Sequence, residues 1–244
     1  MNTKNQNIAK IIRASDRGST KISWLNSLHT FSFADYYDPD NKGFKNLRVL
    51  NDDFVAAESG FDLHPHFNME ILTYVLEGEL SHFDTLGNSG TIKAGEFQLI
   101  SGGEGLMHSE HNRTKSMTRF LQIWIKPNAR GGEPGYQQSS VADLEVDSLG
   151  LLSVSSAMTP YLNLKSDVEV KLGKFDEANN IDLAEYGKRA AYIHLISGNL
   201  ALKFSGDSEE VSLLLNEADG IALYDISELS LSNSKGVEYL LFLL

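Results

Sequence analysis

Gly60–His111 reads GFDLHPHFNMEILTYVLEGELSHFDTLGNSGTIKAGEFQLISGGEGLMHSEH. Five of the seven histidines of the chain lie in this segment: His64, His66, His82, His108 and His111. Two groups have the spacing of metal ligands, His64-Pro65-His66 and, about 40 residues later, His108-Ser109-Glu110. This segment is therefore the candidate metal-binding region of the chain.

Both groups place their candidate ligands two residues apart. In a β-strand, side chains at positions i and i+2 project from the same face, and Pro65 favours an extended backbone for the residue before it. Together, His64, His66, His108 and Glu110 offer three imidazole nitrogens and one carboxylate oxygen. Such a set suits one divalent ion of iron, manganese, cobalt, nickel, copper or zinc, and it does not choose among them. Four protein ligands leave coordination positions open for water, oxygen or substrate.

Short antiparallel strands separated by turns are predicted between the two groups. Thr73–Leu76 and Phe97–Ile100 have strand composition, and Gly87-Asn88 is typical of a hairpin tip. Such strands can fold back and bring both groups onto one barrel wall. Either group alone is weak evidence of a metal site, and the strands between them strengthen the prediction.

The layout resembles the cupin superfamily, whose small jelly-roll barrels hold a metal between two short motifs. The first motif has a glycine, a His-x-His, a glutamate and a glycine, and this chain follows it with Gly60, His64, His66, Glu70 and Gly78, although Glu70 comes one residue early for the longer version of the motif. The second motif departs from the superfamily, because Ser101 stands where a proline is usual and the histidine comes two residues late.

More specifically, the chain resembles the pirin branch of that superfamily. The resemblance is carried by His29–Tyr37 (HTFSFADYY), by His64-Pro65-His66 with Met69-Glu70, and by Gly103–Glu110; with Leu47–Asp53 it covers roughly residues 13–126. Two departures lie near the expected site. Phe67, followed by Asn68, stands where pirins usually have arginine, and Glu104 stands where a neutral or basic residue is expected.

The resemblance implies an all-β fold of two cupin-type jelly-roll barrels, a bicupin with few short helices. It also implies that His64, His66, His108 and Glu110 hold the metal, the set that the spacing suggests. Several pirins act as quercetin 2,3-dioxygenases. The resemblance therefore implies an oxidoreductase that opens a flavonol ring with O₂ and releases carbon monoxide, with a small aromatic substrate and O₂ as its partners. Glu110 is then the candidate catalytic residue, as acceptor of the flavonol hydroxyl proton.

Two alternatives stay open. Pirins are also described as regulators, so the chain can be a non-catalytic metal-binding protein that contacts a transcription or metabolic protein. It can also be a cupin isomerase or another enzyme that needs no O₂. A deep apolar cavity at the metal favours an enzyme acting on aromatic substrates, whereas a closed site beside a flat exposed patch favours the regulator.

Aromatic side chains near the two groups are candidates for lining such a cavity, or for packing in the barrel core. They are Phe31, Phe33, Phe61, Phe67 and Phe97.

The composition excludes several classes of function. The chain has 244 residues with 21 Lys and Arg and 33 Asp and Glu, a net charge of −12. Such a chain repels phosphate backbones, so nucleic acid is not expected as a direct partner, while a protein partner stays open. It has no cysteine, which excludes disulfides. No apolar segment is long enough to span a bilayer, and residues 1–10 lack the apolar core of a signal peptide. We expect a cytoplasmic monomer without a membrane partner.

Two domains are predicted. Residues 1–126 form the N-terminal barrel with the metal site, and residues 127–140 form a linker, because they contain Pro127, Gly131-Gly132 and Pro134-Gly135. Residues 141–244 repeat the first half, since Tyr192–Leu200 aligns with Thr73–Leu80. Neither ligand group has a counterpart there. A degenerate second barrel without metal is predicted, with His194 packed in a strand.

The remaining histidines and acids of the first half are interpreted as structural. His29 is expected to pack or hydrogen-bond rather than bind metal. His82 is expected to be exposed or structural, and His111 to face the opposite side of its strand from the metal. Glu70 is expected to be structural, or an outer carboxylate that orients a metal ligand. Asp52-Asp53 are expected to be a solvated or capping pair.

Overall fold

The computed structural model describes residues 7–156, 162–204 and 211–244. Their regular structure is almost entirely β-strand. The helical segments among them are three short 3₁₀ turns: η1 (Ala14–Asp16), η2 (Val141–Asp143) and η3 (Leu183–Tyr186). The prediction of an all-β chain with few short helices is confirmed. No helix in this described part is long and apolar enough to cross a membrane.

The chain divides into two compact units. Arg17–Leu144 and Val154–Val168 form one unit, which we call the first barrel. Met1–Asp16, Glu145–Ser153 and Glu169–Leu244 form the other, which we call the second barrel.

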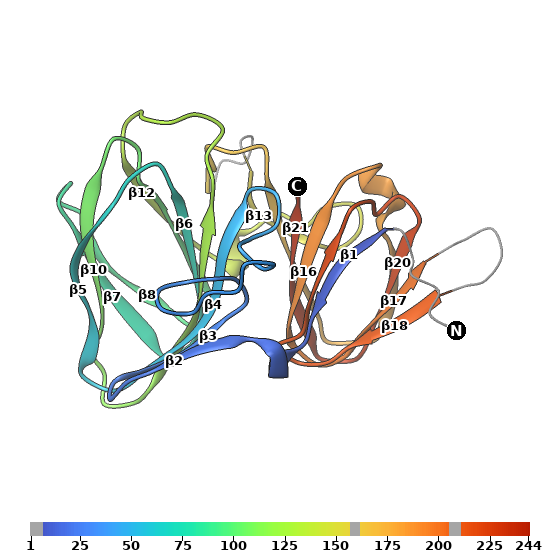
Figure 1. The fold of residues 1–244 in the computed structure, drawn as a ribbon, viewed down its shortest axis with the longest axis horizontal. Helices are drawn as coiled ribbons and strands as arrows, with labels where there is room; N and C mark the ends of the chain where they lie inside the picture. The colour runs from blue at the N-terminus through green and yellow to red at the C-terminus, as the bar shows by residue number, and fades with distance from the viewer. Residues whose placement is uncertain (1–6, 157–161, 205–210) are drawn as a thin grey trace. The chain divides into compact units, whose positions relative to one another are not determined.

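Two antiparallel sheets form the first barrel (Figure 1). Its strands are β2 (Gly18–Lys21), β3 (Leu25–His29), β4 (Leu47–Val55), β5 (Ser59–His66), β6 (Glu70–Glu77), β7 (Glu79–Asp84), β8 (Ser89–Lys93), β9 (Glu96–Ser101), β10 (Leu106–Asn112), β11 (Thr118–Ile125) and β12 (Gly135–Ser140). The seven-stranded sheet has the order β12-β9-β6-β11-β4-β3-β2, and the four-stranded sheet has the order β5-β10-β7-β8.

The inward positions of β10 explain why the first barrel has a polar interior. Leu106, His108, Glu110 and Asn112 are buried, while the residues between them are more exposed, which is the period of two of a strand with one face inward. Three of these four inward side chains are polar. Buried polar groups need partners, so this strand marks the interior as a site rather than a purely apolar core.

Among the described residues, apolar side chains pack in other parts of that interior, and two clusters stand out. One consists of Val55, Val75, Leu80, Ile92 and Phe120. The other consists of Ile71, Ile100 and Leu106. Burying each of these side chains stabilises the folded barrel by about 1.5–3 kcal/mol relative to leaving it exposed. The strands around the polar groups are therefore held firmly in place.

The segment predicted as a linker, residues 127–140, is not a linker throughout. Its last six residues are β12, which pairs with β9 from Gly135 opposite Ser101 to Ser140 opposite Glu96. Pro127, Gly131, Gly132 and Pro134 precede this strand, and Gly135 is its first residue. An unpaired sheet edge offers free backbone N–H and C=O groups, and Gly135–Ser140 contains no proline that would prevent pairing.

The second barrel also has two sheets. Its strands are β1 (Ile8–Ile12), β13 (Leu152–Ser155), β14 (Glu169–Phe175), β15 (Asn179–Asp182), β16 (Ala191–Ser197), β17 (Leu200–Phe204), β18 (Val211–Leu215), β19 (Gly220–Leu223), β20 (Leu229–Asn233) and β21 (Val237–Leu243). The six-stranded sheet has the order β1-β19-β16-β21-β14-β13, and the four-stranded sheet has the order β15-β20-β17-β18.

The N-terminal strand corrects the predicted boundary of the first domain, residues 1–126. β1 pairs antiparallel with β19, and Ile8 and Ile11 pack against the apolar core of the second barrel. Packing against that core partly buries these two isoleucines. The sequence pattern did not indicate which of the two barrels this strand would join. His194, on β16, is buried in this barrel, as predicted for a packed strand histidine.

Candidate metal centre

The pairing of β5 with β10 brings the two ligand groups together. His64 lies opposite His108 in the antiparallel register, and Phe61 lies opposite Glu110. Between these pairs β10 has one residue and β5 has two, so β5 contains a bulge. Without a bulge, side chains three residues apart on a strand would point to opposite faces. The extra residue in β5 changes which positions point inward, so both Phe61 and His64 line the cavity.

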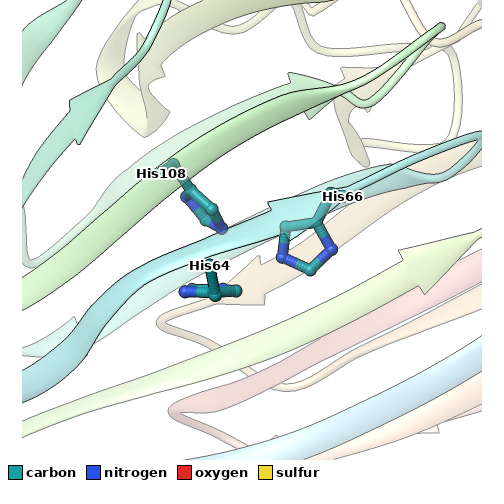
Figure 2. Close-up of side chains that lie close together, drawn as sticks. All are labelled: His64, His66 and His108. Atoms are coloured by element: carbon teal, nitrogen blue, oxygen red, sulfur yellow. The ribbon is translucent and has the colours of Figure 1, made fainter.

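The three histidines form a compact group (Figure 2). The ring centroids of His64 and His108 are 4.4 Å apart, and each is 4.8 Å from that of His66. One nitrogen from each ring can be chosen so that all three lie within 4.8 Å of one another. Three imidazoles at this spacing can bind one ion.

The environment of these rings fits a metal. His108 is fully buried, yet neither of its ring nitrogens has a hydrogen-bond partner among the described residues, and leaving such atoms unpaired is unfavourable. His64 Nδ1 donates to the carbonyl oxygen of Asp62 at 2.8 Å, which leaves Nε2 available as a ligand. The donor set of neutral imidazoles and a carboxylate suits a first-row divalent ion.

Burial also keeps two of the rings neutral, which is the form that binds metals. Burial, with His108 and His64 nearby, lowers the pKa of His66 to about 3. Burial, with His64 and His82 nearby, lowers the pKa of His108 to about 3. Neither ring has to lose a proton at neutral pH before it can bind an ion.

Glu110 is buried on the same strand as His108 but does not belong to the compact histidine group. Its Oε1 accepts a hydrogen bond from Gln98 Nε2 at 3.1 Å, and its Oε2 accepts one from Gln122 Nε2 at 3.0 Å. Its role as a ligand stays a prediction. The two glutamines were missed by sequence reasoning; the available signal was an amide at an inward position of an otherwise apolar strand.

A cavity of about 530 Å³ opens beside the histidines, and His64, His66 and Glu110 line it. Its apolar lining is Leu25, Phe33, Ala34, Phe61, Pro65, Phe67, Met69 and Trp124. Of the five aromatic candidates, Phe33, Phe61 and Phe67 line the cavity. Phe31 and Phe97 are fully buried core residues instead.

Comparison with known proteins decides the family. Residues 12–125 match the family model described as Pirin, and residues 152–244 match that of the quercetinase C-terminal cupin domain. The quercetin 2,3-dioxygenase of Escherichia coli K12 is 38% identical over 233 residues, 94% of this chain and 96% of that protein. The chain belongs to the pirin family.

Solved structures agree with this assignment. The E. coli pirin YhhW in complex with nickel(II) has a TM-score of 0.83 at 38% identity, covering 96% of this chain and 98% of that one. The E. coli protein YhaK has a TM-score of 0.68 at 25% identity, covering 94% and 93%. The predicted bicupin fold is confirmed, and so is a quercetin 2,3-dioxygenase-like pirin at the level of the family.

In this pirin-family chain the acidic pair Asp52-Asp53 is neither solvated nor a cap, and that prediction was wrong. The side chains project to opposite faces of β4, and both are buried. Asp52 accepts hydrogen bonds from Arg119 Nε and Nη2, each at 2.9 Å. Asp53 lines the cavity and accepts a hydrogen bond from the hydroxyl of Ser27.

His29 also lines the cavity and is held by hydrogen bonds, as predicted. Its Nδ1 is 2.9 Å from Asn51 Oδ1, and its Nε2 is 2.9 Å from Thr20 Oγ1. Burial is the main reason that its pKa lies below the usual value. Both ring nitrogens are occupied, so His29 does not complete the metal site.

His82 is buried rather than exposed, and the structural reading is the right one. Its Nε2 is 3.1 Å from Asp84 Oδ2, its ring stacks on Tyr136 at 4.6 Å, and it lies 5.6 Å from the ring of His108. Burial opposes ionisation of Asp84, but hydrogen bonds from Asn88, His82 and two backbone N–H groups together lower its pKa.

Glu70 is structural, because β5 ends at His66 and the chain turns before β6 begins. Asn68 has a positive φ of 51° in that turn, so the strand parity that would aim Glu70 at the metal is broken. Its carboxylate accepts hydrogen bonds from Ser101 Oγ at 2.8 Å and from the backbone N–H of Lys165 at 3.2 Å. It orients none of the three histidines.

The two departures from the family pattern lie in different environments. Phe67 lines the cavity and is 58% exposed, so it lies at the cavity edge, with its ring packed against Gly105. Glu104 is exposed and is not a lining residue; its backbone N–H donates to Gly132. Phe67 is therefore the departure that bears on the substrate. His111 lies 3.5 Å from Asp62 on the outer face, as predicted.

Proposed function

We propose that this chain is a metal-dependent dioxygenase of the quercetin 2,3-dioxygenase type, which opens a flavonol ring with O₂ and releases carbon monoxide. The observation that carries the proposal is the position of His64 and His66. With His108 they form the compact imidazole group, and both line the cavity of about 530 Å³. The name of the E. coli relative and the nickel(II) complex of the E. coli pirin support it.

In this proposal His64, His66 and His108 hold one divalent transition-metal ion, and Glu110 is the fourth ligand. Fe²⁺ is the expected ion, and manganese, cobalt, nickel, copper and zinc suit the same donors. When bound, the ion supplies Lewis acidity, which favours the ionised form of a substrate hydroxyl and orients the substrate relative to O₂. The unpartnered nitrogens of buried His108 support this arrangement.

Glu110 accepts the proton of the flavonol hydroxyl. Gln98 and Gln122 donate hydrogen bonds to its two oxygens and hold the carboxylate where it lines the cavity. A nearby cation favours the ionised form of a carboxyl group, so Glu110 acts as a base through proximity rather than through high basicity.

The aromatic lining contributes substrate binding and exclusion of water. Phe33, Phe61, Phe67 and Trp124 give the cavity flat apolar surfaces, which suit a planar ring system. A dry cavity protects an electron-rich substrate from protonation by water. A cavity of this kind beside the histidines favours an enzyme over a regulator, because a regulator needs only the metal state and an exposed surface.

The test is to measure carbon monoxide in the headspace over quercetin and O₂. The protein is loaded separately with iron, manganese, cobalt, nickel and copper. His108→Ala is the site variant, and His194→Ala is the matched control, because it removes a buried strand histidine from the second barrel. We expect metal-dependent carbon monoxide from the wild type and from His194→Ala, and none from His108→Ala. A fully loaded wild type that releases none with any metal would rule out the proposed reaction.

A further inference from the structure

The cavity has a polar wall in addition to its aromatic surfaces. Gln122, which donates to Glu110, is one polar side chain of the seven-stranded sheet that lines it. The other five are Thr20, Ser27, His29, Asn51 and Asp53. We call these five the polar wall. The histidines of the metal centre come from the four-stranded sheet of the same barrel. The two sheets thus give the cavity a metal-binding side and a polar side.

Most of the polar wall is occupied by hydrogen bonds among its own members. His29 pairs with Thr20 and with Asn51, both at 2.9 Å. Ser27 donates its hydroxyl proton to Oδ1 of Asp53. These contacts fix the side chains without a ligand.

Besides Nδ2 of Asn51, which has no hydrogen-bond partner in the described part of the chain, the exception is Asp53. It is only 3% exposed, and its Oδ2 has no hydrogen-bond partner within the described part of the chain. Asp53 Oδ2 is not one of the fully buried polar atoms that lack a partner. This oxygen is therefore accessible from the cavity that Asp53 lines. A buried carboxyl oxygen that faces a cavity is stabilised by a donor supplied from the cavity.

The chemistry of that oxygen selects a class of ligand group. A hydroxyl both donates and accepts hydrogen bonds, so it pairs with a carboxyl group in either protonation state. A carbonyl or ether oxygen only accepts, and it is repelled by the ionised form. The aromatic surfaces beside Asp53 add a planar apolar body to the expected ligand.

We propose that Asp53 is a substrate-binding residue that recognises one hydroxyl group of a planar phenolic substrate, with Ser27 holding the carboxyl group in place. This inference rests on the proposed function for its substrate class. It assigns Asp53 to the selection and orientation of the substrate, separate from the proton acceptor Glu110.

The test measures equilibrium binding without O₂, so that no turnover is needed. Quenching of tryptophan fluorescence reports binding, because Trp124 lines the cavity. Quercetin is compared with analogues that each lack one hydroxyl group, on metal-loaded wild type, Asp53→Asn and Asp53→Ala. Glu70→Gln is the matched control, because Glu70 is also a buried carboxylate held by a serine hydroxyl, Ser101, but does not line the cavity.

We expect the wild type and Glu70→Gln to prefer quercetin over one analogue by about tenfold or more, the value of a hydrogen bond to a charged group. In Asp53→Ala this preference should fall to within about twofold, and Asp53→Asn, whose amide also donates and accepts hydrogen bonds but carries no charge, should keep only part of it. Metal content equal to that of the wild type shows that a variant is folded. If both Asp53 variants keep the wild-type preference for every hydroxyl group, the inference is wrong.

The outcome is independent of the carbon monoxide assay. A lost preference together with no carbon monoxide from the wild type refutes the proposed reaction and supports the binding role of Asp53. Carbon monoxide release together with an unchanged preference supports the reaction and refutes the binding role.

Discussion

Asp53 makes the stability of the metal-free protein depend on pH. Burial raises the pKa of Asp53 from 3.8 to about 7, opposed by the hydrogen bond from Ser27 and reinforced by the nearby charges of Asp52 and Glu110, with Arg17 opposing. The folded protein therefore binds this proton more tightly than the unfolded chain does. The resulting stabilisation is fully present below pH 3.8 and is lost as the pH rises through about 7.

The magnitude follows from the size of the shift. Each pKa unit corresponds to about 1.4 kcal/mol. A rise from 3.8 to about 7 therefore removes about 4 kcal/mol between the low-pH and high-pH limits. Most of the change that can be measured falls between about pH 5 and about pH 8, where it amounts to roughly 2.5 kcal/mol.

Urea denaturation of the chelator-treated wild type and of Asp53→Asn tests this value. Asparagine has the shape of the protonated acid but does not titrate, and contributions from the other groups largely cancel in the difference between the two proteins. We expect the free energy of unfolding of Asp53→Asn, relative to the wild type, to rise by roughly 2.5 kcal/mol from about pH 5 to about pH 8.

Metal loading is the internal control for this experiment. A cation in the site favours the ionised form of Asp53 and lowers its pKa, so the pH-dependent difference should shrink in the loaded protein. A difference between the two metal-free proteins that is the same at both pH values would refute the argument that Asp53 retains a proton because it is buried.

Two further predictions concern the metal and the outer face of β4. His108→Ala and Glu110→Ala should each lose most of the bound metal by elemental analysis while His194→Ala keeps it, and equal metal content in all three would overturn the site assignment. Arg119→Ala should lower the free energy of unfolding by about 1–3 kcal/mol in urea denaturation. It removes the two-point partner of the buried Asp52 carboxylate, while Arg17 stays 3.8 Å away. An unchanged free energy of unfolding would contradict this.

Local geometry was enough to predict that two of the candidate ligands lie close together. His64 and His66 are two residues apart on a strand, and their shared face follows from the pleat alone. The same rule does not extend to Glu70, which is an even number of residues from His64 and His66, because the chain turns at Asn68 and the alternation of faces does not continue through a turn. It also gave no account of Phe61, which reaches the cavity because of the bulge in β5.

The domain boundaries show a second limit. Glycine and proline correctly mark the break that begins at Pro127, but they do not show that Gly135–Ser140 forms the strand β12. Ile8–Ile12 likewise pairs with a strand more than 200 residues away in the chain. Strand pairing between distant segments depends on which sheet edge is free, and that is a property of the assembled sheets.

The sequence by itself determined the fold class, the family resemblance and the four candidate ligands, because strand periodicity and short motifs are written in neighbouring residues. Only the tertiary structure decided that three histidines meet beside a cavity, that Asp53 lines it, and that Glu110 is held by two glutamines. The physical reason is that burial depends on side chains that come together from strands far apart in the sequence. Burial in turn sets the pKa of Asp53 and decides which polar groups need a partner.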